Sequence, residues 1–189
     1  FTEGSLNTFA KPTNVDTNSR ILCYDIRDLG KQLLPVGMLV VLDSVFNRII
    51  RNRRLGRSTW VYIDEIYLLF QHEYSANFLF TLWKRVRKYG ACCTGLTQNV
   101  DDLLQSHTAR TMLANSEFLV MLNQASTDRA ELARLLNISD NQLSYITNVD
   151  FGRGLIKCGS AIVPFMDHFP KNNLYRLMST KPSEADAAV

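Results

Sequence analysis

Residues 60–65 read WVYIDE, four apolar residues followed directly by Asp64 and Glu65. Such a short aromatic and β-branched run is typical of a buried strand, which we expect over 59–64. In open α/β sheets, ligands bind at the carboxyl ends of the strands, where both acids would emerge. Nucleotide hydrolysis needs one acid that holds Mg²⁺, commonly through water, and one that orients or deprotonates the attacking water. Asp64 fits the first role and Glu65 the second. The alternative is a strand end with two solvated acids.

A second strand that ends in a polar residue is expected further along the chain. Residues 75–89 carry a helical apolar stripe, and Gly90 stands where a C-terminal cap should lie. Residues 91–97 (ACCTGLT) then predict a strand, after which Gln98 follows. A glutamine at the tip of a strand beside the acidic one could contact the γ-phosphate of a nucleotide or its attacking water. Alternatively, Gln98 only begins a turn or caps the helix that follows.

The rest of the chain continues the alternation of short apolar runs and helical periods. We expect further strands at 20–26 and 117–122, helices at 42–55, 101–114 and 127–136, a capping box from Ser139 to Gln142, and a hairpin of 154–158 with 161–165. Strands separated by helices imply an α/β fold with a mainly parallel sheet that is covered on both faces. We expect one domain over residues 1–178 and a frayed tail over 179–189.

Composition indicates a globular domain, because 46% of the residues are hydrophobic and 21% are charged. The longest nearly apolar run, 33–42, contains Pro35 and Gly37 and is about half the length of a membrane helix, so we expect no transmembrane segment. The four cysteines lack the spacing of a metal site and are expected to be buried free thiols in a reducing compartment. Trp60 is expected to be a core anchor.

Basic residues gather in two segments, although the net charge of +3 does not itself indicate a nucleic-acid-binding protein. Five arginines lie within 48–57, and four basic residues lie within 84–88. Solvated helix faces are one interpretation, and contacts with phosphates or with a protein partner are the other.

Several of these motifs in combination resemble a known group of motors. A strand ending in Asp64-Glu65, a helix ending in RKYG at 87–90 and a strand ending in Thr97-Gln98 resemble the FtsK–HerA superfamily of hexameric translocases. Further runs are similar to the ATPases of conjugative type IV secretion systems, the VirB-four/TraC/TraE family: LNQA at 122–125 with Asp128-Arg129, LNIS at 136–139, QLSY at 142–145 and FMDHFP at 165–170. The similarity extends over about residues 14–182 and implies a RecA-like P-loop NTPase core with a C-terminal β-hairpin.

The resemblance also implies roles for single residues. Asp64 and Glu65 match the Walker B acids of the family, Gln98 matches its sensor glutamine, and Arg87 matches the arginine that related motors offer to the nucleotide of a neighbouring subunit. Gln124 and Arg129 match a further pair, which we assign to cofactor binding without a defined role. The cofactors implied are ATP and Mg²⁺.

One motif of the family is absent. The sequence contains no G-x-x-x-x-G-K-[ST] phosphate-binding loop, because Gln32 follows Gly30-Lys31 in place of the hydroxyl residue. We expect this loop to lie upstream of the 189 residues in a longer protein. Without it, the chain is expected to bind ATP weakly or not at all.

Partners and location follow from the resemblance alone. It implies a cytoplasmic motor, usually hexameric, that lies at the inner face of the cell membrane and contacts channel and coupling proteins, with DNA bound indirectly or weakly. Such a motor would power pilus or channel assembly and DNA transfer. Two alternatives remain open: a DNA translocase of the same superfamily, and a catalytically inert RecA-like scaffold that docks channel proteins.

Overall fold

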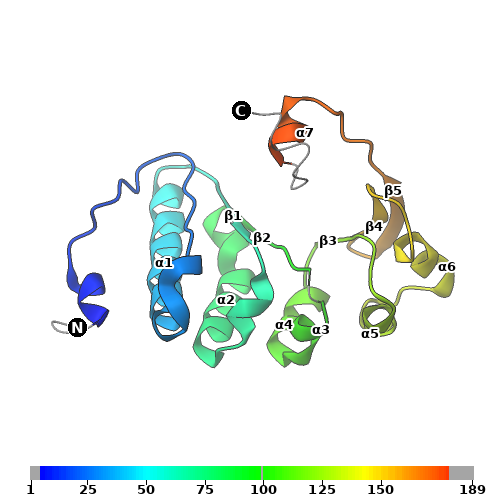
Figure 1. The fold of residues 1–189 in the computed structure, drawn as a ribbon, viewed down its shortest axis with the longest axis horizontal. Helices are drawn as coiled ribbons and strands as arrows, with labels where there is room; N and C mark the ends of the chain where they lie inside the picture. Colours follow the sequence, from blue (N-terminus) through cyan, green and yellow to red (C-terminus); the bar gives the residue numbers. More distant parts are fainter. Residues whose placement is uncertain (1–4, 99, 179–189) are drawn as a thin grey trace. The chain divides into compact units, whose positions relative to one another are not determined.

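The structure is a computed structural model that describes residues 5–98 and 100–178 (Figure 1). The chain divides into two compact units, Phe1–Asn99 and Val100–Val189. The tail expected over 179–189 lies outside the described residues, and the prediction of one domain over 1–178 stays a prediction.

The first unit is a two-stranded parallel sheet with helices packed against it. Its elements are η1 (Ser5–Ala10), η2 (Arg27–Leu29), α1 (Gly30–Arg54), β1 (Thr59–Ile63), η3 (Ile66–Phe70), α2 (Glu73–Arg85), η4 (Val86–Tyr89) and β2 (Ala91–Gly95). β1 pairs with β2 in parallel, with Thr59 opposite Ala91 and Ile63 opposite Gly95. The expected strands at 59–64 and 91–97 are therefore confirmed. The helix expected over 75–89 is present as α2, with its last turn tightened into the 3₁₀ helix η4.

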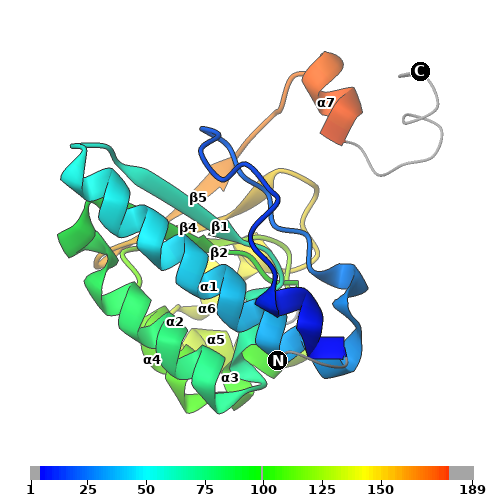
Figure 2. The same cartoon turned by 90° about the vertical axis from the view of Figure 1, so that its left-hand side faces the viewer.

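Helix α1 begins well before the residues that the sequence predicted. Its buried side chains Met38, Leu42 and Ile49 follow a helical spacing, which extends the expected stripe toward the N-terminus. Figure 2 shows α1 and α2 side by side, and edge-on contact between Phe46 and Phe78 (ring centroids 6.1 Å apart) joins them. By length and composition alone, Gln32–Arg54 could cross a membrane, with a mean hydropathy of 1.7. One face of α1 packs against α2, and 22% of its most apolar stretch is buried.

Three expectations from the sequence are wrong. Residues 20–26 form no strand, because no described strand lies beside them; Tyr24 instead shares a 3.0 Å hydrogen bond with Ser44 of α1. Trp60 is 65% exposed rather than a core anchor, because side chains alternate along β1 and the described helices cover only one face of this strand. The cysteines are free, but Cys93 is half-buried and the other three are exposed.

The second unit combines a three-stranded antiparallel sheet with short helices. Its elements are α3 (Val100–Gln105), α4 (His107–Ala114), β3 (Phe118–Met121), α5 (Ser126–Leu136), α6 (Asp140–Leu143), η5 (Ser144–Ile146), β4 (Arg153–Cys158), β5 (Ala161–Met166) and α7 (Asn173–Met178). The helix expected over 101–114 is split into α3 and α4, because Ser106 caps α4 by accepting a hydrogen bond from the backbone N–H of Ala109 (3.3 Å).

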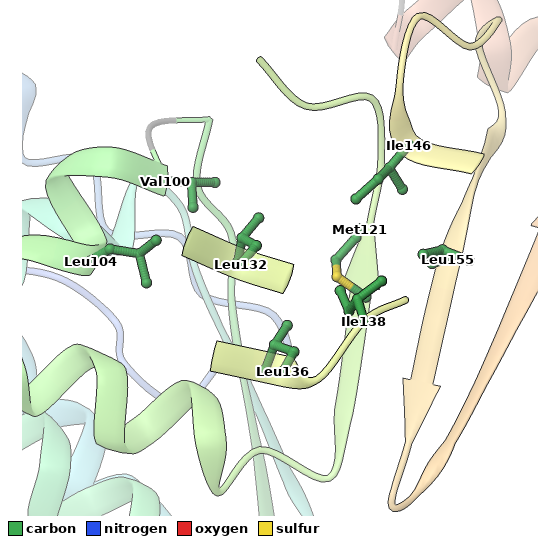
Figure 3. Close-up of a cluster of buried hydrophobic side chains, with 8 residues drawn as sticks. All are labelled: Val100, Leu104, Met121, Leu132, Leu136, Ile138, Ile146 and Leu155. Carbon is green, nitrogen blue, oxygen red and sulfur yellow. The ribbon is translucent and has the colours of Figure 1, made fainter. Parts of the chain in front are cut away.

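The core of the second unit lies between its helices and its sheet (Figure 3). It contains apolar side chains from α3, β3, α5, the segment 138–146 and β4, namely Val100, Leu104, Met121, Leu132, Leu136, Ile138, Ile146 and Leu155. Ile146 and Leu155 are fully buried. These contacts explain why the otherwise irregular segment between α5 and β4 has a defined path.

The sequence correctly predicted the local motifs of the second unit. Ser139 and Gln142 form a capping box with both reciprocal hydrogen bonds. β4 and β5 form the expected hairpin, with Gly159 in the turn at a positive φ of 56°. β3 pairs antiparallel with β4. The α/β class is confirmed, and the parallel pairing is that of β1 with β2.

Candidate functional site

The acids and the glutamine that the sequence singled out lie at the same edge of the β1–β2 sheet. Asp64 and Glu65 directly follow β1, and Gln98 comes three residues after β2 ends at Gly95. Because the two strands are parallel and in register, their carboxyl ends lie together. The structure therefore brings these three residues to one edge.

Two backbone hydrogen bonds of Leu96 flank the two acids in the chain. The N–H of Leu96 donates to the carbonyl of Ile63 (2.8 Å), and the carbonyl of Leu96 accepts from the N–H of Ile66 (2.9 Å). Asp64 and Glu65 form the bend between these two bonds. The position of both acids is thus determined by the strand that leads to Gln98.

Glu65 has a backbone conformation that is unusual for a residue with a side chain. Its φ and ψ are 47° and 48°, in the left-handed region, which costs such a residue roughly 1–2 kcal/mol. Its N–H donates a 3.0 Å hydrogen bond to Oδ1 of Asp64, which supports the bend. Asp64 itself is exposed, whereas Glu65 is half-buried.

The Glu65 carboxylate carries an unmet hydrogen-bonding capacity. Its Oε2 atom is buried and has no hydrogen-bond partner among the described residues. A buried carboxylate oxygen without a partner is destabilising, so groups of this kind are expected to gain one in the functional state. A water molecule or a ligand group at this edge of the sheet would supply it.

Gly95, which the sequence analysis did not assign to the site, permits this arrangement. A Cβ atom at Gly95 would lie 2.5 Å from Cδ1 of Ile66, the first residue of η3. The glycine lets η3 pack closely on the end of β2, directly after the acids. A single glycine inside a strand pattern is a signal for such a close approach.

Arg87 is not part of this cluster within its own unit. It is exposed in η4, which precedes β2, whereas Asp64 and Glu65 follow β1. Arg87 therefore lies at the opposite end of the two parallel strands, whose five residues each span about 16 Å. Gly90 ends η4 with a left-handed cap (φ 65°, ψ 32°), as expected.

Gln124 and Arg129 belong to the second unit, where both contact its internal loops. The side-chain amide of Gln124 donates to the carbonyls of Leu122 (3.1 Å) and Asn123 (3.3 Å). Nη1 of Arg129 donates to Oγ1 of Thr147 (2.6 Å), while its Nε is buried without a partner among the described residues. These contacts give both residues a structural role in the second unit. That they bind a cofactor stays a prediction.

One arginine of the first basic cluster has a structural role that the sequence did not indicate. The guanidinium of Arg48 in α1 donates to the backbone carbonyls of Thr17 and Ser19, the latter at 2.9 Å. It thereby holds the segment before residue 20 against the helix. A cluster of arginines gives no sign of which member does this, because the acceptors are backbone atoms distant in sequence.

The residues present fit only part of an Mg²⁺–nucleotide site. The exposed Asp64 carboxylate and the partnerless Glu65 oxygen suit the metal and the attacking water. Among the described residues, no three His, Cys, Asp or Glu side chains are grouped to hold a metal by themselves. The phosphate-binding loop is absent from the 189 residues. The chain thus has acids that suit such a site, but its 189 residues lack the phosphate-binding loop.

Comparison with known proteins identifies relatives of this arrangement. The model of the TraG P-loop domain family matches residues 12–153. Among solved structures, VirB4 of Thermoanaerobacter pseudethanolicus is similar, with a TM-score of 0.74 and 26% sequence identity. The match covers 85% of this chain and 45% of that chain, so the 189 residues span less than half of the VirB4 chain. A comparison with curated protein sequences finds no match.

Proposed function

We propose that this chain, which belongs to the TraG P-loop domain family, carries the water-activating side of the nucleotide site in an ATPase of a type IV secretion machine. The likeness to VirB4 confirms the RecA-like P-loop fold expected from the sequence. The family is one of conjugative-transfer ATPases, so ATP and Mg²⁺ are the expected ligands of the complete site.

The observation that carries the proposal is the buried, partnerless Oε2 of Glu65 on a left-handed bend. A general base needs a carboxylate oxygen free to accept a hydrogen bond from water, and this atom meets that need. The bend holds it beside Asp64, whose exposed carboxylate would bind Mg²⁺ through water. Bound Mg²⁺–ATP would supply the phosphoryl group, and Gln98 would contact its γ-phosphate or the attacking water.

The phosphate-binding loop has to come from outside the 189 residues. We propose that a longer protein supplies it upstream, as expected from the sequence. Two observations support this arrangement: the match covers less than half of the VirB4 chain, and Gln32 rather than a hydroxyl residue follows Gly30-Lys31. Under this proposal the 189 residues hydrolyse ATP only as part of the longer protein.

Arg87 would act on the nucleotide of a neighbouring subunit. Its place at the far end of the strands from Glu65 supports a role outside its own site. A guanidinium near the γ-phosphate neutralises charge that develops during phosphoryl transfer. This role requires a ring of subunits, for which we propose a hexamer at the cytoplasmic face of the membrane that contacts channel proteins and powers their assembly and DNA transfer.

The test is phosphate release by the longer protein that contains the phosphate loop. Glu65→Gln should reduce turnover about 10²–10⁴-fold while nucleotide binding is retained, because the base is lost but size and hydrogen bonding are kept. Glu73→Gln makes the same chemical change on an exposed acid in the first turn of α2 and serves as the control. Turnover of Glu65→Gln within about threefold of the wild type would contradict the proposal. If the wild type itself shows no turnover, the inert docking scaffold becomes the better interpretation.

A further inference from the structure

The two basic clusters, separate in the sequence, meet in the structure at one end of the β1–β2 sheet. The guanidinium of Arg53, near the end of α1, lies 5.4 Å from the centroid of the Tyr89 ring in η4. The same ring packs edge-on against Phe46 of α1, with centroids 5.6 Å apart. The segments that follow α1 and η4 are also hydrogen-bonded to each other, because the N–H of Thr59 donates to the carbonyl of Gly90 (3.3 Å). The ends of α1 and η4 are therefore neighbours.

We call the basic side chains at the end of α1, in the last turn of α2 and in η4, together with Arg57, the basic edge. All of them are exposed, and they are Arg51, Arg53, Arg54, Arg57, Lys84, Arg85, Arg87 and Lys88. The sequence has no acidic residue between Asp43 and Asp64, and none between Glu73 and Asp101. Within the described part of the chain, the ion pairs Arg110–Glu131, Arg134–Glu131 and Arg153–Asp150 all lie in the second unit. The basic edge is thus a concentration of positive charge without carboxylate neighbours in sequence or in ion pairs.

Helix ends explain only part of this charge. Basic residues in the last turn of a helix interact favourably with the helix dipole, by about 0.3–1 kcal/mol each, and both α1 and η4 have them. Arg57, however, lies beyond the end of α1 at Arg54, and neighbouring like charges repel one another. A polyanion would remove that repulsion.

We propose that the basic edge binds the phosphodiester backbone of a nucleic acid without sequence selection. Six of the eight residues are arginines, whose planar forks bind phosphate oxygens in pairs. An anionic lipid surface fits less well, because membrane docking also needs apolar side chains that enter the interface. At this end of the sheet the described residues expose two large apolar side chains, Leu55 (59%) and Trp60 at the start of β1 (65%), against the eight basic ones.

This binding would not use the acids of the proposed nucleotide chemistry, although Arg87 belongs to both proposals. Asp64 and Glu65 lie at the other end of the strands, about 16 Å away along β1. A nucleic acid on the basic edge would therefore not meet the two acids of its own unit. The test variant below leaves Arg87 and Glu65 unchanged, so failure of the nucleic-acid proposal can be told apart from failure of the proposed function.

The experiment measures fluorescence anisotropy of a labelled oligothymidylate of about 20 nucleotides with the 189-residue chain. The test variant is Arg54→Ala/Arg57→Ala/Lys88→Ala, since these side chains are exposed and make no hydrogen bond or ring contact with other described residues. Arg53 is left unchanged because it packs on Tyr89. The control, Arg134→Ala/Lys157→Ala/Lys171→Ala, removes three basic residues of the second unit.

We expect the wild type and the control to bind within about twofold of each other, and the test variant to bind at least about tenfold more weakly. Each phosphate contact on a single strand contributes about 0.7 to the slope of log affinity against log salt, so the test variant should lose about 2 from that slope between roughly 50 and 200 mM NaCl. Arg54→Glu/Arg57→Glu, which leaves η4 intact, is a second variant and should bind more weakly still. Far-UV circular dichroism checks that the variants fold.

Two results would overturn the proposal. The first is equal affinity of the test variant and the control for the oligonucleotide. The second is binding of the wild type to phosphatidylserine vesicles but not to the oligonucleotide, with the vesicle binding lost in the test variant; the basic edge would then be a lipid-docking surface. Phosphatidylcholine vesicles serve as the uncharged reference.

Discussion

The backbone N–H of Ile66 donates a 2.9 Å hydrogen bond to the carbonyl of Leu96, and this bond closes the bend that contains Glu65. It links the end of β1 to the residue that follows β2. As a result, the left-handed conformation of Glu65 is imposed by a neighbouring strand rather than by its own sequence. At Glu65, the conformation and buried carboxylate that suit the proposed role in hydrolysis are therefore expected to lower the stability of the chain.

Glu65→Gly should therefore stabilise the chain. Glycine adopts the left-handed region without the steric cost of a Cβ, and the change also removes the buried, partnerless Oε2. We expect the free energy of unfolding to rise by about 1 kcal/mol, which raises the melting temperature by roughly 2–4 °C in a chain of this size. Glu65→Ala removes the carboxylate but keeps the Cβ, so it should gain less. A glycine variant that melts below the alanine variant would contradict this account of the bend.

Mg²⁺–ATP should not stabilise the 189-residue chain. Stabilisation by a ligand equals RT ln(1 + [L]/Kd). Without the phosphate-binding loop we expect Kd to far exceed the ligand concentration, so this stabilisation approaches zero. Thermal unfolding with and without millimolar Mg²⁺–ATP measures the shift. A saturable rise in melting temperature would show that these residues hold the phosphates by themselves, and it would contradict the proposed division of the site.

Mixing two inactive variants tests the role of Arg87 between subunits. In the longer protein, Arg87→Ala and Glu65→Gln should each lose hydrolysis, since comparable arginines contribute about 10³–10⁵ in rate. Rings that contain both variants would have some interfaces with an intact Glu65 and an intact Arg87 from the next subunit, so partial activity should return.

The control for this mixing experiment is Arg134→Ala, which removes a 77% exposed arginine of the second unit and should keep its activity. Co-assembly of the two variants has to be shown by a tag on one of them. Absence of rescue in mixed rings would place the action of Arg87 within its own subunit. An active Arg87→Ala protein would reduce Arg87 to a solvated residue at a helix end.

The four cysteines should differ in their reaction with iodoacetamide. Burial, together with the neighbouring Cys92, raises the pKa of Cys93 to about 12, while Cys23, Cys92 and Cys158 are exposed. The thiolate is the reactive species, so at pH 8 Cys93 should be alkylated far more slowly than the other three. Peptide mass spectrometry over a time course reads each site. The denatured chain, in which all four should react alike, is the control, and rapid labelling of Cys93 in the folded chain would contradict its burial.

Local patterns in the sequence were enough to predict several helices and strands and the position of Asp64, Glu65 and Gln98 at one edge of the β1–β2 sheet. WVYIDE at 60–65 contains both the strand and the acids that follow it, and Gly90 and Gly159 mark a helix end and a hairpin turn through their positive φ. Ser139 and Gln142 form their capping box within four residues. Each of these features depends on neighbours along the chain, so the residues themselves determine it.

Other features depend on which distant segment lies alongside, and only the tertiary structure decided them. Residues 20–26 have the composition of a strand, yet a strand needs a partner, and none lies beside them among the described residues. Trp60 has the composition of a core residue but lies on the face of β1 that the described helices leave open. The bend at Glu65 is imposed by Leu96, and the basic edge exists because Tyr89 packs between Arg53 and Phe46. Hydrogen bonds and packing between segments distant in the chain leave no periodicity in either segment, which is why the sequence alone could not reveal them.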